Sequence, residues 1–274
     1  MRIDQHTELY GVLGYPIRHS LSPVMHNAAF SAKYINAVYL AFETPDIKGA
    51  IAGIRALGIK GMSVTIPYKE KIITYIDELD PTAEEIGAIN TIVNQDGYLI
   101  GYNTDGIGAL KALKENMKLK GTKCLIVGSG GAAKSIGFTL KHEGAEIIIT
   151  NRTFNRGKEL SDLLSCNFVP WEDINRIKAD LIVQTTPVGM TPHIELCPIP
   201  EDILRPGMVV MDIIYNPMQT KLLKLALSKG CTTINGISMF VYQGAEQFML
   251  WTGLKPPITI MKTTVEKALT RIMR

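Results

Sequence analysis

The chain has 274 residues, about two average domains, with 46% hydrophobic and 20% charged residues. This balance excludes a disordered chain and supplies enough apolar side chains for at least one large core. Lysine and arginine number 29 against 26 aspartates and glutamates, without a basic run, so we expect no nucleic-acid partner, whereas a small anionic substrate is possible.

The cysteines and the apolar segments indicate where the protein works. Cys124, Cys166, Cys197 and Cys231 lack the close pairs of metal sites and secreted disulfide frameworks, so we expect reduced thiols and no metal. The first residues lack the apolar core of a signal peptide, and the longest stretch without Asp, Glu, Lys or Arg, Gly230–Ala245, is polar and too short to span a bilayer. We therefore expect a cytoplasmic protein with no membrane partner.

Short apolar runs alternate with amphipathic stretches in the first part of the chain, which predicts a parallel α/β sheet. The expected strands are Tyr10–Gly14, Ala37–Phe42 and Gly61–Ile66. The expected helices are one that follows Ser22 as its N-cap, with Pro23 in the first turn, and those over Asp46–Leu57 and Tyr68–Ile76. Two further strands, Ile89–Asn94 and Tyr98–Tyr102, flank the turn dipeptide Asp96-Gly97, which predicts a closing hairpin.

A second series of elements begins near Asp105. The expected elements are a helix to about Glu115, a strand Cys124–Val127, a helix to Glu143, strands Glu146–Thr150, Leu181–Val183 and Met208–Ile214, and helices from Met239 to the end. The strand–turn–helix–strand at its start is a βαβ unit. Since no linker or low-complexity segment separates the two series, the boundary near Asn103 depends on motifs alone.

A glycine-rich turn, Gly128-Ser129-Gly130-Gly131-Ala132, follows a predicted strand and opens a predicted helix. There the backbone can approach a pyrophosphate, although a tight strand-to-helix turn would have the same residues. About 20 residues further, where an NAD site usually carries an acid for the ribose, the chain has Asn151-Arg152-Thr153 and then Arg156. These residues favour a 2′-phosphate, hence NADP; solvated arginines at a helix start are the alternative.

Small polar residues gather at predicted strand ends and at one helix start. Ser20 and Ser22 could cap a helix or bind a polyol or carboxylate. Thr65 and Lys69 follow a strand whose carboxyl end should face a ligand, although Lys69 alone would be read as a surface lysine. Further such groups, each an ordinary turn former by itself, are Asn90-Thr91 and Asn103-Thr104-Asp105.

Taken together, these motifs resemble the shikimate dehydrogenase family over nearly the whole chain. The motifs are Ser20-Leu21-Ser22-Pro23, Thr65-Ile66-Pro67-Tyr68-Lys69, Gly87-Ala88-Ile89-Asn90-Thr91, Asn103-Thr104-Asp105, Gly128 to Ala132, Asn151-Arg152-Thr153 and Gln243-Gly244-Ala245. The resemblance implies a two-domain α/β protein, with an N-terminal open α/β sheet substrate domain over 1–104 and a Rossmann NADP-binding domain over 105–238. It also implies that C-terminal helices over 239–274 pack back onto the first domain; the alternative is that they cover the Rossmann sheet. It also implies reversible NADPH-dependent reduction of 3-dehydroshikimate to shikimate, in the pathway to chorismate and the aromatic amino acids.

The resemblance further implies the site residues. The catalytic pair would be Lys69 and Asp105, which also contact substrate. The other substrate-binding residues would be Ser20, Ser22, Thr65, Asn90, Tyr215 and Gln243. The cofactor residues would be Gly128, Ser129, Gly130, Gly131, Ala132, Asn151, Arg152, Thr153, Arg156, Ile213 and Gly236. The implied partner is a small-molecule substrate, and the implied state is a monomer or homodimer.

The chain departs from the family pattern at three places. This chain has Ser63 where many relatives have Asn, and this difference is expected to retune a hydrogen bond near the substrate. It also has Tyr68 where many relatives have Phe, and Gln184 at the start of a stretch that more commonly begins with Asn; these two differences should matter little. Two alternatives stay open. A quinate/shikimate dehydrogenase that uses NAD would carry an acid in place of Asn151-Arg152-Thr153 and looser packing around the paired serines. A non-catalytic Rossmann regulatory module would lack Lys69 or Asp105.

Overall fold

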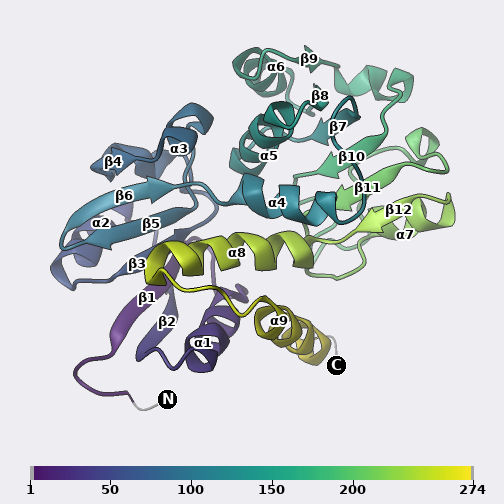
Figure 1. Cartoon of the computed structure of the whole chain (residues 1–274). Helices are drawn as coiled ribbons and strands as arrows, with labels where there is room; N and C mark the ends of the chain where they lie inside the picture. Colours follow the sequence, from purple (N-terminus) through teal and green to yellow (C-terminus); the bar gives the residue numbers. More distant parts are fainter. Residues whose placement is uncertain (1–2, 273–274) are drawn as a thin grey trace. The chain divides into compact units, whose positions relative to one another are not determined.

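A computed structural model describes residues 3–272 of the chain (Figure 1). The chain forms two compact units: unit 1 contains the residues up to Thr104 and those from Gln243 onward, and unit 2 contains Asp105–Tyr242. The chain re-enters unit 1 within a single helix, α8 (Gly236–Thr252), whereas the sequence-based division sets this return at residue 239.

Unit 1 is built on a six-stranded mixed sheet. Besides part of α8, its elements are β1 (Glu8–Gly14), α1 (Ser22–Ala32), β2 (Ala37–Glu43), α2 (Ile47–Ala56), β3 (Gly61–Val64), the 3₁₀ helix η1 (Lys71–Tyr75), β4 (Glu78–Leu79), α3 (Pro81–Ile86), β5 (Thr91–Gln95), β6 (Tyr98–Tyr102) and α9 (Ile258–Ile272). The strand order is β2-β1-β3-β5-β6-β4; β1 pairs in parallel with β2 and β3, and β5 pairs antiparallel with β3 and β6. The β5–β6 pair is the predicted hairpin, and positive φ angles at Asp96 (51°) and Gly97 (95°) give its type I′ turn.

Helix α1 starts differently from the prediction. It begins at Ser22, and its N-cap residue is Leu21, so the assignment of Ser22 as the N-cap is wrong. The backbone N–H of Ser22 donates to Ser20 Oγ at 3.2 Å instead, and Ser20 therefore satisfies one of the donors at the helix start.

Two other predicted helices are also corrected. The segment 68–76 holds only the short η1, because its β-branched run Ile72-Ile73-Thr74 disfavours a regular α-helix. The C-terminal helical region begins at Gly236 rather than Met239. It is divided into α8 and α9 at Gly253, whose φ of 67° ends a helix, with prolines shortly after it.

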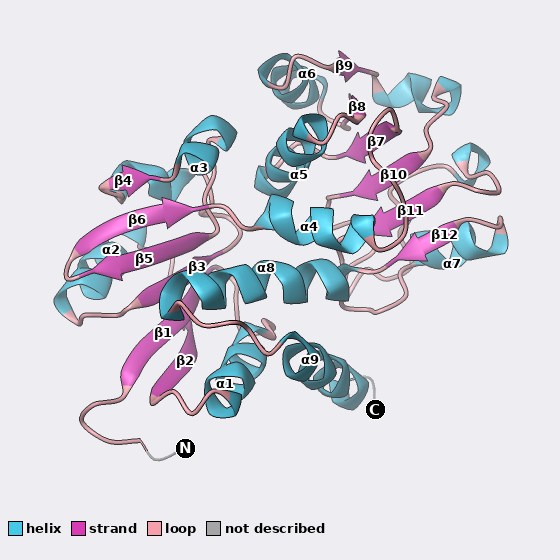
Figure 2. Cartoon of the chain, in the orientation of Figure 1, coloured by secondary structure: helices cyan, strands magenta, loops and turns pink. Residues whose placement is uncertain are grey.

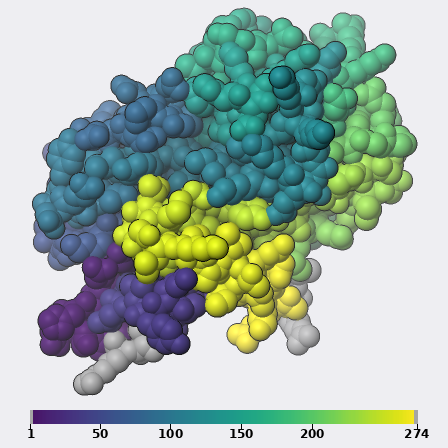
Figure 3. Space-filling model, viewed as in Figure 1, coloured from purple at the N-terminus to yellow at the C-terminus, as the bar shows by residue number. Residues whose placement is uncertain are grey.

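The side chains of β3 alternate between the two faces of the unit 1 sheet. Met62 and Val64 belong to a buried cluster that includes residues of α2, η1 and α3, whereas Ser63 faces α8 and bonds to it. On that second face, Phe30 of α1 packs on Phe248 of α8 with ring centroids 5.7 Å apart, and α1 and α9 pack together. Figure 3 accordingly shows C-terminal residues, in yellow, against the purple of α1.

Unit 2 is a doubly wound α/β structure around a six-stranded, fully parallel sheet. Its elements before α8 are α4 (Asp105–Lys114), β7 (Lys123–Val127), α5 (Gly131–His142), β8 (Glu146–Thr150), α6 (Phe154–Leu163), β9 (Asn167–Phe168), η2 (Trp171–Arg176), β10 (Leu181–Gln184), η3 (Glu201–Ile203), β11 (Val209–Asp212), α7 (Lys221–Ser228) and β12 (Thr232–Ile234). The order β9-β8-β7-β10-β11-β12 is that of a Rossmann sheet, with its switch point between β7 and β10 (Figure 2).

The side chains of β7 alternate between the two faces of the unit 2 sheet, and each face has its own buried core. Cys124 and Ile126 join a buried cluster with residues of α4, α5 and α6, whereas Leu125 and Val127 join a second one with residues of η2 and α7. Strands buried on both faces read as the continuous apolar runs seen in the sequence. The predicted α/β fold class with its Rossmann sheet is confirmed. Within residues 3–272, none of the helices is both long and apolar enough to cross a membrane.

Candidate functional site

The glycine-rich turn lies at the switch point of the unit 2 sheet. Gly128 follows β7 with a φ of 118°, and a Cβ there would lie 2.5 Å from Oγ1 of Thr185, just beyond the neighbouring strand β10. Only glycine suits this position. Ser129 lies in the turn, and Gly131 and Ala132 open α5, whose N-terminal backbone N–H groups and dipole favour an anion. Nothing lies within 4 Å of the place a Cβ would take at Gly130, so this glycine-rich turn, the glycine cradle, is open on that side.

A basic turn follows β8, the next strand of the sheet. Asn151 Nδ2 donates to the Thr153 carbonyl at 2.9 Å, which fixes the turn, and Thr153 is the N-cap residue of α6. Arg152 and Arg156 are exposed. These arginines follow β8, which pairs with β7 in the sheet, and guanidinium groups suit a 2′-phosphate because their fork of N–H donors matches phosphate oxygens. The residues present therefore fit NADP.

The remaining candidate residues of unit 2 lie beyond β11 and at the start of α8. A Cβ on Gly236 would lie 2.2 Å from the Ile213 carbonyl oxygen, so the backbone of these two residues approaches closely only because residue 236 is glycine. The ring of Tyr215 packs on Phe240 of α8 with centroids 4.7 Å apart.

Sequence reasoning missed Asp212, the last residue of β11. Its carboxylate is fully buried and accepts hydrogen bonds from Thr220 Oγ1 at 2.7 Å and from Ile214 N at 3.0 Å. Burial raises the pKa of this carboxyl to about 7, although both hydrogen bonds lower it. An acid at the end of the apolar run Met208–Met211 is the sequence signal that could have identified Asp212 as a buried carboxylate.

In unit 1 the structure brings Asn90, Thr104 and Gln243 into one buried cluster. Asn90 Nδ2 donates to Thr104 Oγ1 at 2.9 Å and to Gln243 Oε1 at 3.3 Å, and Asn90 Oδ1 accepts from Thr104 N at 2.9 Å. Thr104 Oγ1 donates in turn to the Gln243 carbonyl at 3.1 Å. Thr104 and Gln243 are 139 positions apart in the sequence, so the polar site forms only when the end of the chain returns to unit 1.

Thr65 and Lys69 follow β3, as expected. The Thr65 backbone N–H donates to the Leu13 carbonyl at 3.0 Å, next to the end of β1. The Lys69 carbonyl accepts from Ile89 N at 2.8 Å, so the Lys69 backbone is held one residue from Asn90. Both side chains are partly exposed.

The other candidates lie at the start of α1 and at the start of α4. Ser20 is partly exposed before α1, and Ser22 is buried in its first turn. Asp105 is the first residue of α4 and follows Thr104 directly in the chain. It is therefore one peptide bond away from the residue whose N–H binds Asn90.

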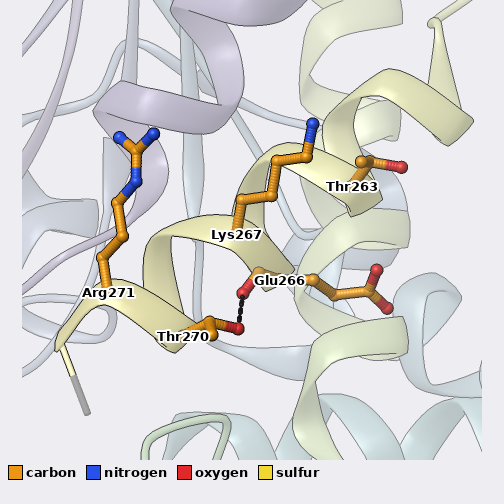
Figure 4. Close-up of a pocket in the computed structure, with 5 residues that line it drawn as sticks. All are labelled: Thr263, Glu266, Lys267, Thr270 and Arg271. Atoms are coloured by element: carbon orange, nitrogen blue, oxygen red, sulfur yellow. Dashed lines mark hydrogen bonds between the residues drawn. The ribbon is translucent and has the colours of Figure 1, made fainter. Parts of the chain in front are cut away.

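A shallow surface pocket on α9 contains none of these residues. Figure 4 shows its lining, which comes from one face of that helix: Thr263, Glu266, Lys267, Thr270 and Arg271. The Thr270 hydroxyl donates to the Glu266 carbonyl at 2.9 Å. In the described part of the chain, no group of at least three His, Cys, Asp or Glu residues is placed to hold a metal.

The Rossmann strand order, the glycine cradle and the arginines after β8 define the class: a two-unit α/β protein with a dinucleotide-binding unit. Family models then match three segments: "Shikimate dehydrogenase substrate binding domain" over residues 12–92, "Shikimate / quinate 5-dehydrogenase" over 110–195 and "Shikimate 5'-dehydrogenase C-terminal domain" over 236–266.

Individual relatives match along almost the whole chain. A curated shikimate dehydrogenase (NADP(+)) from Moorella thermoacetica is 44% identical, over 98% of this chain and 96% of its own length. A curated shikimate dehydrogenase (NADP(+)) from Pyrococcus furiosus is 45% identical, over 95% of this chain and 96% of its own length. A crystal structure of a shikimate dehydrogenase in complex with NADP⁺ has a TM-score of 0.94 and 43% identity, over 98% of each chain. The chain belongs to the shikimate dehydrogenase family, as its motifs predicted.

Proposed function

We propose that this chain catalyses the reversible NADPH-dependent reduction of 3-dehydroshikimate to shikimate, in the pathway to chorismate and the aromatic amino acids. The observation that carries the proposal is the buried pair of Asn90 and Gln243 in unit 1, 3.3 Å apart. Asn90 lies at the ends of β3, β5 and β6, and Gln243 lies on α8. Within a family of shikimate dehydrogenases, two such amides suit a small polyhydroxylated acid, because amides can both donate and accept.

Substrate recognition is assigned to unit 1, with Tyr215 added from unit 2. Ser20 and Ser22 are proposed to hold the carboxylate, since hydroxyl donors at the start of α1 act together with the helix dipole on an anion. Hydroxyls of the substrate are proposed to bind the other polar residues of the set: Thr65, Asn90, Tyr215 and Gln243.

Lys69 and Asp105 are proposed to handle the proton. When bound, the reduced nicotinamide supplies a hydride to the ketone carbon. Lys69 then donates a proton from Nζ to the developing alkoxide, whose negative charge the ammonium also stabilises. The Asp105 carboxylate orients that ammonium and accepts a hydrogen bond from a substrate hydroxyl, a role that an amide would fill poorly.

The cofactor is proposed to bind unit 2. Backbone N–H groups over Gly128–Ala132 would hold the pyrophosphate, and Asn151, Arg152, Thr153 and Arg156 would hold the 2′-phosphate. Ile213 and Gly236, whose backbones approach closely, would complete the site. The two arginines argue against an NAD-dependent quinate/shikimate dehydrogenase, and the presence of both Lys69 and Asp105 argues against a non-catalytic module.

We also propose a cytoplasmic location and a monomer or homodimer. The location is supported by the four cysteines, all of which are free thiols in the structure. Burial raises the pKa of the Cys166 thiol to about 11, which keeps it protonated and unreactive at neutral pH.

The test is a comparison of four substrate and cofactor combinations with the purified wild-type protein. NADPH or NADH is mixed with 3-dehydroshikimate or 3-dehydroquinate, and the absorbance of the reduced nicotinamide is followed. We expect the highest kcat/KM with NADPH and 3-dehydroshikimate. A preference for NADH and 3-dehydroquinate would identify the NAD-using alternative, and NADPH binding without turnover would identify the regulatory module.

A further inference from the structure

A chain of buried hydrogen bonds runs from β2 through α8 to Asn90. The Tyr39 hydroxyl donates to Ser63 Oγ at 2.6 Å, and Ser63 Oγ donates to Gln247 Oε1 at 2.8 Å. Gln247 Nε2 then donates to Thr91 Oγ1 at 3.0 Å and to the Asn90 carbonyl at 3.1 Å. All five residues are buried, with at most 6% of any of them exposed. Of the five, only Asn90 belongs to the proposed substrate-binding set.

In this series of hydrogen bonds, each donor points along the path that leads from Tyr39 to Asn90. The single Ser63 hydroxyl hydrogen is used on Gln247, so Ser63 accepts the hydrogen of Tyr39. Both hydrogens of Gln247 Nε2 are used on Thr91 and on the Asn90 carbonyl, so the Thr91 hydroxyl is an acceptor there. Its own hydrogen therefore goes to Asn90 Oδ1, at 2.8 Å.

The direction of the donors decides which way the Asn90 amide faces. Because Thr91 and the Thr104 backbone N–H both donate to Oδ1, the Asn90 NH₂ group must face the other way, where it donates to Gln243 Oε1. The flipped amide would set NH₂ against two buried donors, and unpaired buried donors are costly.

We propose that Gln247 is a positioning residue for substrate binding, which holds the Asn90 amide, and through it Gln243, in the orientation that meets the substrate. This inference rests on the proposed function. Ser63, which accepts a hydrogen bond from Tyr39, fixes the Gln247 amide, and within this proposal the Ser63–Gln247 bond is the one that a change at residue 63 is expected to retune. Since Thr104 also holds Asn90 Oδ1, loss of Gln247 should weaken the arrangement and not abolish it.

The test measures steady-state kinetics with shikimate and NADP⁺ for Gln247→Met and Thr91→Val, which remove polar atoms at nearly constant volume. Each should raise the KM for shikimate about fivefold, the size of one neutral hydrogen bond, and leave the KM for NADP⁺ unchanged. Thr91→Ser keeps the hydroxyl and should restore the wild-type value. The double variant should show about the same fivefold effect, because both residues act along one path.

The matched control is Asn94→Ala, at the far end of β5. Asn94 is buried like Gln247, and its side chain makes three hydrogen bonds, to Ile59 O (2.9 Å), Ile54 O (3.2 Å) and Gly97 N (2.7 Å). The Asn94→Ala variant should have a lower Tm and an unchanged KM for shikimate, which separates a loss of stability from a loss of positioning.

Two results would overturn the inference while the wild type turns over shikimate normally. One is a wild-type KM for shikimate in both Gln247→Met and Thr91→Val; the other is a raised KM in Thr91→Ser equal to that in Thr91→Val. If Gln247→Met does not fold, the two Thr91 variants decide between these outcomes. A wild type that does not turn over shikimate would overturn the proposed function, and the positioning role with it.

Discussion

Acidification should destabilise unit 1 through His26, and His26→Phe should remove that part of the pH dependence. His26 of α1 is fully buried; its ring stacks on Tyr39 with centroids 4.6 Å apart and lies 5.2 Å from Trp251. Among the described residues, neither ring nitrogen has a partner at hydrogen-bond geometry. Burial lowers the pKa of His26 from 6.5 to about 3, and the Gln247 side chain acts in the opposite direction.

The sign and the size of the change in the free energy of unfolding with pH follow from these two pKa values. The unfolded chain binds a proton at His26 near pH 6.5, whereas the folded chain binds it only near pH 3, so stability is fully present above pH 6.5 and is lost as pH falls. At 1.36 kcal/mol per pKa unit, the free energy of unfolding should fall by about 2 kcal/mol between pH 8 and pH 5. By about pH 3 the loss should reach about 4 kcal/mol.

The assay is urea unfolding followed by the fluorescence of Trp251, at pH 8 and at pH 5. The chain has 2 tryptophans, and the other one, Trp171, lies in unit 2, so both proteins should carry Trp171→Phe. Phe is a ring of similar size that does not titrate, and every other group titrates equally in the two proteins. The difference in stability between them should therefore change by about 2 kcal/mol between the two pH values. If the free energy of unfolding changed by the same amount between pH 8 and pH 5 with His26 and with Phe at this position, His26 would not be the source of the pH dependence.

Four further variants test the pKa of Asp212, the choice of cofactor and the binding of the substrate carboxylate. The pKa of Asp212 is raised from 3.8 to about 7, so unit 2 should lose stability as pH rises from about 4 to 7, and Asp212→Asn should flatten that slope in urea unfolding followed by Trp171. Arg152→Asp should lower the ratio of kcat/KM for NADPH to that for NADH by about 10- to 100-fold, the size of one charge-assisted hydrogen bond; an unchanged ratio would exclude Arg152 from cofactor choice. Ser20→Ala and Ser22→Ala should each raise the KM for shikimate about tenfold or more, with an unchanged KM for NADP⁺, whereas a lower Tm alone would make these serines structural.

Much of the fold is local enough to be predicted from the sequence. The apolar runs of unit 2 become strands buried on both faces, and Asp96-Gly97 forms the type I′ turn that its residues favour. Gly128 is recognisable because the chain must turn sharply there between a strand and a helix, and the family and the fold class are confirmed. The roles of Lys69, Asp105 and the other site residues stay predictions.

Tertiary interactions explain what sequence reasoning missed. Gln247 is one more polar residue on a helix until the fold brings it to Ser63, which is 184 positions away. The N-cap of α1 differs from the predicted one because Ser20 accepts the hydrogen bond from the backbone N–H of Ser22, which depends on the conformation of the preceding loop. The hydrogen-bond network around Asn90 likewise requires the return of the chain into unit 1 at Gln243.

The most direct test of the account is the turnover of Lys69→Ala with NADPH and 3-dehydroshikimate, compared with Lys71→Ala and wild type. Lys71 is an exposed lysine at the start of η1 and belongs to no proposed site. If Lys69 delivers the proton to the alkoxide, Lys69→Ala should lose about 10² to 10⁴ in kcat and keep the wild-type Kd for NADPH, and Lys71→Ala should match wild type. Near-normal turnover by Lys69→Ala would contradict the central claim that this lysine carries the chemistry.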